Sequence, residues 1–242
     1  MIDLHCHILP GIDDGAIDLA DSVAMARTAA SDGIEIVAAT PHIRHDHDVR
    51  IPELAGRVAE VSQALEAEAI PVEVITGGEV AETALDGLEE DELRAVSLGG
   101  AGWILLEPRP GPLGESLIDS IVRLRSAGFR PLVAHPERHV SPDLPERIRE
   151  LIAAGALIQA TAAFLADGPA QEGMLALARR GLIHVLSSDA HSSLRGRPLR
   201  ISEGLRALSE IEPLREHLDW IGSEAPAAIV RGDDVEPPYP AI

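Results

Sequence analysis

The sequence contains no lysine, so all twenty of its basic residues are arginine. This absence excludes a phosphate-binding P-loop lysine, a lysine Schiff base and a metal-bridging carbamylated lysine. Recognition of an anion must then come from arginine, backbone amides or bound metal ions. Aromatic residues are also rare, with two phenylalanines, two tryptophans and one tyrosine. Few positions could therefore stack on an aromatic substrate.

Cysteine occurs only once, at Cys6. A single cysteine excludes an intrachain disulfide and any zinc site built from several thiolates. Cys6 lies between two histidines in an apolar segment that is typical of a β-strand. Because side chains alternate in direction along a strand, we expect Cys6 to point away from both histidines. We interpret it as a small buried residue rather than as a nucleophile.

The chain has little positive charge, with 40 acidic residues against 20 basic ones and a formal net charge of -20. This balance argues against binding to a nucleic-acid backbone and against direct binding to an anionic membrane. It does not exclude an anionic substrate, because metal ions can reverse the local field. The sequence has no apolar run of about 18 residues and no basic segment before an apolar one. We therefore expect a soluble cytoplasmic protein.

Short apolar runs alternate with amphipathic segments along the 242 residues, which we take as one domain spanning 1–242. Apolar residues at three- and four-residue intervals predict helices in the segments between the runs. This alternation predicts an α/β fold, either a parallel β/α barrel or a related wound sheet. From Pro198 onward we expect helices packed on the outside. The predicted strands are 2–6, 34–40, 72–76, 103–107, 131–135, 156–159 and 184–187, and the predicted helices are 17–32, 51–69, 114–127, 144–154 and 169–180, with a possible short helix at 88–94.

Histidines and acidic residues follow or end six of the seven predicted strands. Active sites of parallel β/α proteins lie at the carboxyl ends of the strands, so we expect these side chains to converge there. Burying so many imidazoles and carboxylates without cations would be costly, and bound metal ions would offset that cost. The candidate metal ligands are His5, His7, Asp14, His42, Glu79, Glu107, His135, Asp189 and His191.

This set of ligands contains histidine and carboxylate and needs no thiolate, which suits manganese, zinc or iron. It exceeds the needs of one ion, so we predict two or three divalent ions that share a bridging carboxylate. Such clusters typically activate water and hold the oxygens of a phosphoryl group. The residues thus predict a metal-dependent phosphomonoester hydrolase.

The successive motifs "DLHCHILPGIDDG", "ATPH", "GGEV", "LLEP", "AHPER" and "SSDAH" followed by "GRP" resemble those of the PHP superfamily of polymerase and histidinol phosphatase domains. The sequences of these motifs are most similar to those of the bacterial protein-tyrosine phosphatases of the CpsB/CapC type, which are found with capsule and exopolysaccharide genes. The resemblance runs from residue 1 to about residue 200. It implies a distorted (β/α)7 barrel with a trinuclear site, often of manganese, at the carboxyl ends of the strands.

The resemblance also implies which residues share an ion. One ion would be held by His5, His7, Glu79 and Asp189, a second by Glu79, Glu107 and His135, and a third by Asp14, His42 and His191. Arg138 and Arg197 would bind the phosphate, which suits the bidentate geometry of guanidinium. The implied reaction is attack of a metal-bound hydroxide on phosphotyrosine, without a phosphoenzyme. The implied partner is an autophosphorylated, membrane-associated bacterial tyrosine kinase of polysaccharide synthesis.

Several alternatives remain open from the sequence. The same site could hydrolyse histidinol phosphate or another small phosphomonoester, or the chain could be an inactive module stabilised by metal. A metal-dependent amide hydrolase is disfavoured by the absence of lysine. His45 and His47, which follow His42, could be additional ligands or solvated loop residues. Phe164 is the one aromatic residue placed where it could stack on a phenyl ring, although it could equally pack under a loop.

Overall fold

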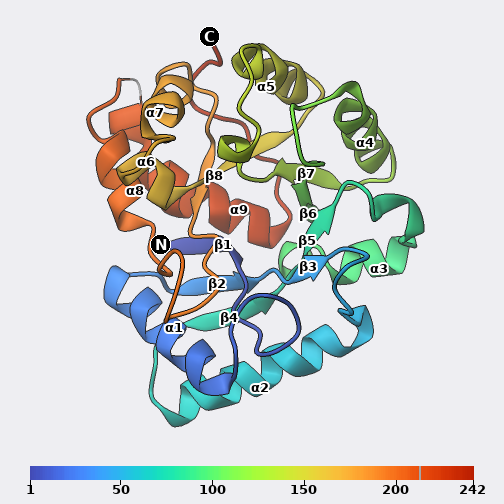
Figure 1. Ribbon diagram of the computed structural model, residues 1–242, viewed down its shortest axis with the longest axis vertical. Helices are drawn as coiled ribbons and strands as arrows, with labels where there is room; N and C mark the ends of the chain where they lie inside the picture. The colour runs from blue at the N-terminus through green and yellow to red at the C-terminus, as the bar shows by residue number, and fades with distance from the viewer. Residues whose placement is uncertain (213) are drawn as a thin grey trace.

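The computed structural model describes residues 1–212 and 214–242, in which strands and helices alternate and the helices surround the strands (Figure 1). The strands are β1 (Ile2–Cys6), β2 (Ile36–Ala39), β3 (His42–Ile43), β4 (Glu73–Thr76), β5 (Glu79–Ala81), β6 (Trp103–Glu107), β7 (Arg130–Val133), β8 (Leu157–Thr161) and β9 (Val185–Ser187). The α-helices are α1 (Leu19–Asp32), α2 (Leu54–Ala67), α3 (Glu90–Ala95), α4 (Glu115–Ser126), α5 (Leu144–Ala153), α6 (Ala162–Ala166), α7 (Gln171–Arg179), α8 (Ser202–Leu208) and α9 (Ala225–Arg231).

All of the described strand pairs are parallel, as the alternation of strands and helices predicts. One sheet has the order β1-β2-β4 and the other the order β3-β5-β6-β7-β8-β9. The first strand also meets the last part of the second sheet. Cys6 forms a parallel bridge with Ala190, and the amide of His7 donates to the carbonyl of Ala190 at 2.9 Å. The strands therefore curl around a common interior.

The structure describes more strands than the seven that the sequence predicts, because two predicted strands are followed by short second strands. Pro41, which cannot donate a ladder hydrogen bond, separates β2 from β3, and Gly77 and Gly78 separate β4 from β5. His42 and Glu79 consequently lie on paired strands, facing each other in register, rather than in loops beyond a strand. This places two candidate ligands side by side on rigid backbone.

Two layers of apolar packing hold the strands in place. The outward faces of the strands pack against the surrounding helices, whereas Leu4, Ala38, Leu105 and Leu132 form part of a separate buried cluster. Ile229 of α9 belongs to this second cluster and is completely buried. Ile229 therefore covers the inner cluster, whereas Arg231 at the end of the same helix is exposed; α9 is drawn across the centre of Figure 1.

Local signals in the sequence fix where α1 begins and ends. The side chain of Asp18 accepts a hydrogen bond from the amide of Asp21 at 2.9 Å, as expected of an N-cap residue. Gly33 ends the helix with a φ of 83°, a left-handed conformation that favours glycine. Within residues 1–212 and 214–242, the helices are too short or too polar to cross a bilayer.

Candidate metal centre

The nine candidate ligands meet in one cluster, although they come from six regions of the chain. Four sets within this cluster each place one ligand atom per residue within 4.8 Å of the others. Most members are buried, whereas the side chain of Asp14 is 57% exposed and that of His191 is 18% exposed. The four sets are His7, Asp14, His42 and His191; His5, His135 and Asp189; His5, His7 and Glu79; and His42, Glu79 and Glu107.

Backbone geometry explains how the local sequence builds this cluster. His5 and His7 are two residues apart and enter the cluster together, whereas Cys6 packs into the apolar core, as the alternation predicts. His135 and Asp189 have φ values of 35° and 49°. These left-handed conformations are strained for residues other than glycine and occur where a turn must direct a side chain into a site.

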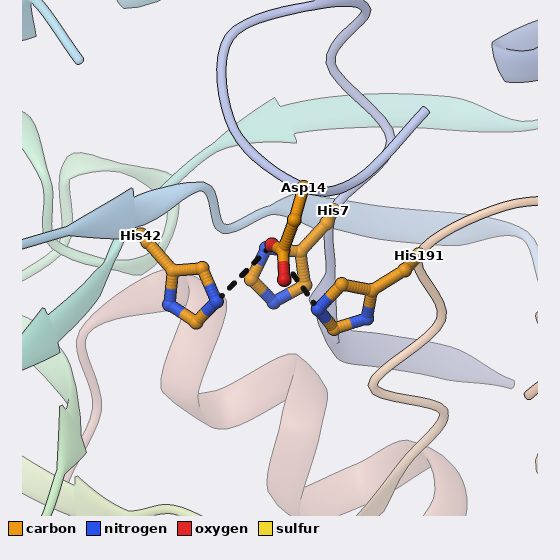
Figure 2. Close-up of side chains that lie close together, drawn as sticks. All are labelled: His7, Asp14, His42 and His191. Atoms are coloured by element: carbon orange, nitrogen blue, oxygen red, sulfur yellow. Dashed lines mark ion pairs between the residues drawn. The ribbon is translucent and has the colours of Figure 1, made fainter. Parts of the chain in front are cut away.

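One set lies around Asp14 at the exposed side of the cluster (Figure 2). The Oδ1 atom of Asp14 is 3.4 Å from Nε2 of His42 and 3.5 Å from Nε2 of His191. His191 also stacks on His7, with ring centroids 4.0 Å apart. Three imidazoles and one carboxylate thus face a common point, which is a donor set suited to a divalent transition metal.

Glu79 lies at the centre of the buried side. Its Oε1 atom is 2.7 Å from Nε2 of His135, and its Oε2 atom is 2.8 Å from Nδ1 of His42. The same Oε2 atom lies 3.4 Å from Nε2 of both His5 and His7. A carboxylate with four imidazoles around its two oxygens has the geometry of a bridging ligand.

The four sets overlap with the ion groups that the family resemblance implies and do not decide between groupings. His135 shares a set with His5 and Asp189, and its Nε2 atom also lies 2.7 Å from Oε1 of Glu79, with which the resemblance places it. Glu107 shares a set with His42 and Glu79. The assignment of each residue to a particular ion stays a prediction.

Residues outside the nine hold the imidazoles in position. Oδ2 of Asp13 lies 2.9 Å from Nδ1 of His7, and Oε1 of Gln159 lies 3.1 Å from Nδ1 of His5. Each contact orients the ring so that Nε2 points into the cluster. Neither role was predicted from the sequence, although the acidic pair "DD" after the "HCH" motif was a visible signal for Asp13. The loop that carries Asp13 passes close to the backbone of His7, since a Cβ at Gly15 would lie 2.2 Å from the carbonyl oxygen of His7.

The electrostatics of the cluster show what a cation would replace. Burial lowers the pKa of His7, but hydrogen bonds with Asp13 and Glu79 outweigh it and raise the pKa to about 10. Burial also opposes ionisation of Glu79, yet the charge of His5 and hydrogen bonds from His135 and His42 hold its pKa well below the usual range. Without metal, protonated His5 and His7 would therefore balance part of the charge of the buried carboxylates, whereas burial lowers the pKa of His135 to about 4. A divalent ion would take over that charge and bind the same imidazoles in their neutral form.

Both arginines that the sequence singled out contact one carboxylate. Nη2 of Arg138 donates to Oδ2 of Asp189 at 2.6 Å, and Nη2 of Arg197 lies 2.8 Å from the same oxygen. Arg197 also donates from Nε and Nη2 to the carbonyl oxygen of Asp189. The guanidinium of Arg197 lies over the ring of Phe164, 5.8 Å from its centroid, so Phe164 packs against the candidate phosphate-binding group.

The additional histidines after β3 occupy the edge of the cluster. The ring of His47 stacks on His42, with centroids 4.9 Å apart, whereas Nε2 of the exposed His45 lies 3.3 Å from the carbonyl oxygen of Thr83. Neither belongs to any of the four sets. Arg44 was not among the predicted site residues, yet its Nη1 donates to Oε1 of Glu107 at 3.3 Å.

The residues present fit a cluster of divalent ions. Oδ1 of Asp189 is a buried polar atom without a hydrogen-bond partner among the described residues, and it lies 3.5 Å from Nε2 of His5. Such an unpaired group is costly in a folded interior. This atom faces other candidate ligands, and the donors of the cluster are imidazole and carboxylate, as hard to borderline cations require.

A curled parallel α/β sheet that carries a cluster of histidines and carboxylates is typical of metal-dependent hydrolases. The sequence matches the family model "Capsular polysaccharide synthesis, CpsB/CapC" over residues 1–217. The chain therefore belongs to the CpsB/CapC family, as its motifs suggested.

Named relatives agree with this membership. The chain is 32% identical to the tyrosine-protein phosphatase YwqE of Bacillus subtilis, covering 99% of this chain and 96% of that one. It is 26% identical to the putative tyrosine-protein phosphatase CapC of Staphylococcus aureus, over 84% and 81% of the two chains. A structure from a study of YwqE and of CpsB from Streptococcus pneumoniae, described as metal-dependent tyrosine phosphatases, matches with a TM-score of 0.85, 30% identity and full coverage of both chains.

Proposed function

We propose that this protein is a metal-dependent tyrosine-protein phosphatase that hydrolyses phosphotyrosine on a protein substrate. The observation that supports this most directly is the buried cluster of five histidines and four carboxylates, bordered by two arginines, in a chain similar to YwqE over nearly its whole length. Divalent ions bound in this cluster would provide positive charge in a chain whose net charge is -20. Without such a centre, an anionic phosphate would be repelled.

The candidate ligands would hold two or three divalent ions, of which manganese is our proposal and zinc or iron the alternatives. When bound, such ions supply Lewis acidity and an activated water for phosphoryl transfer. Glu79 would fix the spacing of the ions, because its two oxygens face different imidazoles. We further propose that the curled strands form a distorted (β/α)7 barrel in one domain of residues 1–242, with the metal centre at the carboxyl ends of the strands.

Arg138 and Arg197 would bind the phosphate oxygens and stabilise the charge that they carry during transfer. Asp189 holds one nitrogen of Arg138 and two of Arg197, so other N–H donors of each guanidinium remain for the substrate. Because Asp189 presents Oδ1 to the cluster and Oδ2 to the arginines, it would align the phosphate-binding groups with the ions. Burial of this carboxylate prevents water from loosening the arrangement.

The family description connects this activity to capsular polysaccharide synthesis. We propose that the physiological substrate is a phosphorylated tyrosine kinase at the membrane, which this protein would meet from the cytoplasm without binding lipid itself. Its acidity would disfavour both nucleic acids and anionic bilayers as partners.

The test is phosphatase activity after chelation and re-addition of Mn²⁺, Zn²⁺, Fe²⁺ or Mg²⁺. A phosphotyrosine peptide, a phosphoserine peptide and histidinol phosphate would be compared in parallel. We expect restored activity to be highest on phosphotyrosine. Activity on histidinol phosphate alone would overturn the proposed substrate, and no activity with any metal would overturn the proposed reaction.

A further inference from the structure

A groove lies beside the metal centre, between the segment that connects β3 to α2 and the region of η2 (Leu85–Gly87) and α3. Its volume is about 550 Å³, which makes it larger than a single side chain requires. Its apolar lining ranges from buried residues such as Ile43 and Ala84 to the exposed Pro52. The apolar lining consists of Ile43, Val49, Ile51, Pro52, Ala84 and Leu88. We call this the β3–α2 groove.

The β3–α2 groove lies next to the metal centre. Arg44 and His45 line it, and they also line a smaller pocket of about 220 Å³. Glu107, a candidate metal ligand, lines that smaller pocket. Because Nη1 of Arg44 lies 3.3 Å from Oε1 of Glu107, this arginine stands between the groove and the candidate ligands.

The charges around the groove select its occupant. Arg44 is already paired with Glu107 and with Asp46. Of the remaining charged residues that line the groove, Arg50 is basic and Asp48, Glu53 and Glu92 are acidic, with Oε2 of Glu53 lying 3.8 Å from Nη2 of Arg57. The groove thus combines an apolar floor with an acidic rim, which favours basic groups. The metal centre, in contrast, would attract anions through its bound ions.

We propose that the β3–α2 groove binds the polypeptide on one side of the phosphotyrosine, and that it prefers apolar side chains flanked by basic rather than acidic ones. The proposal rests on the proposed function, because a protein substrate must extend beyond its phosphorylated residue. A small phosphomonoester would not reach the groove. Substrate choice would then depend on two adjacent surfaces of opposite electrostatic preference.

Two glycines provide a matched test of this proposal. A Cβ added at Gly87, which lines the groove, or at Gly56, on α2 outside the groove, would meet no atom within 4 Å. Gly87→Phe should lower kcat/KM for a phosphotyrosine peptide of twelve or so residues by roughly tenfold, because the remote binding energy is lost. Gly56→Phe should leave that value unchanged. Both variants should hydrolyse free phosphotyrosine as the parent protein does.

The charge preference is tested with peptides that differ only in their flanks. Peptides with arginine or glutamate placed before or after the phosphotyrosine would be compared on the parent protein and on Asp48→Asn/Glu53→Gln. We expect arginine on one side to be preferred, and the double variant to reduce that preference by about threefold. Equal rates for all flanks, or a preference that the double variant leaves intact, would overturn the proposed charge selection.

The assays also separate this proposal from the proposed function. If Gly87→Phe and Gly56→Phe act alike on the long peptide while free phosphotyrosine is still hydrolysed, the groove proposal is wrong and the phosphatase proposal stands. If the parent protein with restored metal hydrolyses neither free phosphotyrosine nor the peptide, the proposed function is wrong, and the groove proposal fails with it.

Discussion

Two buried histidines at opposite ends of the strands show how differently this molecule uses the same side chain. His7 follows β1 and meets Asp13 and Glu79, which raise its pKa to about 10 against the opposing effect of burial. His184 precedes β9, and burial alone lowers its pKa to about 3. Nδ1 of His184 accepts a hydrogen bond from the amide of Ile158 at 3.0 Å. His184 is therefore a neutral structural residue, whereas His7 belongs to a charged cluster.

The two ends differ in how completely their polar atoms are paired. At the cluster end, Oδ1 of Asp189 is buried and has no hydrogen-bond partner among the described residues. At the other end, Ile229 fills the interior between strands, and Nε1 of Trp103 donates to the carbonyl oxygen of Asp233 at 3.1 Å. Unpaired polar atoms lower the stability of the folded state, so apolar burial at the packed end must offset that cost. Changes at the two ends should consequently affect different measurements.

The largest effect is expected from Glu79→Gln. The amide cannot carry the charge that lies close to four imidazoles, so metal binding should fail and kcat should fall on the order of 10³-fold. Metal content and phosphotyrosine hydrolysis would be measured on the same preparation, with Glu73→Gln on the exposed edge of β4 as the control. Full metal content together with unchanged kcat would contradict a central role for Glu79.

The packed end should respond in stability instead. Ile229→Ala removes a fully buried side chain from the inner cluster and should lower the free energy of unfolding by about 3 kcal/mol. Metal content and kcat of the folded protein should remain as in the parent, as measured below the unfolding transition. Val122→Ala, at a half-exposed position on α4, is the matched control. Loss of metal without loss of stability would show that the two ends are not separable.

The sequence predicted the residues of the cluster end but not the packing at the other end of the strands. The spacing of His5 and His7 and the acids or histidines after the predicted strands were enough to expect one cluster, because parallel strands end on the same side. The position of Ile229 was not predictable. A short apolar helix such as α9 carries no local signal that distinguishes packing inside a curled sheet from packing on its surface.

The detailed geometry of the cluster depends on long-range contacts. The pairing of His42 with Glu79 arises from the register of β3 and β5, two strands too short for a periodic pattern to indicate. The contact of Asp13 with His7 depends on the path of the loop at Gly15. A sequence gives the residue types of such a site, whereas loop paths and register decide which residues share an ion.

A smaller effect concerns His184 and pH. In the folded state its pKa is about 3, whereas an exposed histidine has a pKa near 6.5, so below pH 6.5 the unfolded chain binds a proton that the folded chain does not. This contribution to stability is complete above pH 6.5 and declines as the pH falls, by about 1.3 kcal/mol between pH 7 and 5.5. Urea unfolding would be measured at both pH values in the parent protein and in His184→Gln. The decrease in the free energy of unfolding between pH 7 and 5.5 should be smaller in His184→Gln by this amount. Equal losses in both proteins would contradict the assignment.

A small effect on both catalysis and stability is expected at Cys6, although it lies between two candidate ligands. Burial raises the pKa of its thiol well above the usual value, and Sγ lies 3.6 Å from the carbonyl oxygen of Ala190. A buried neutral thiol is a poor nucleophile, so Cys6→Ala should change kcat by less than about twofold while costing about 1 kcal/mol of stability. Loss of hydrolysis in Cys6→Ala with its metals still bound would instead require a covalent role for the thiol. Retained hydrolysis would place the chemistry on the imidazoles and carboxylates that face the opposite side of the strand.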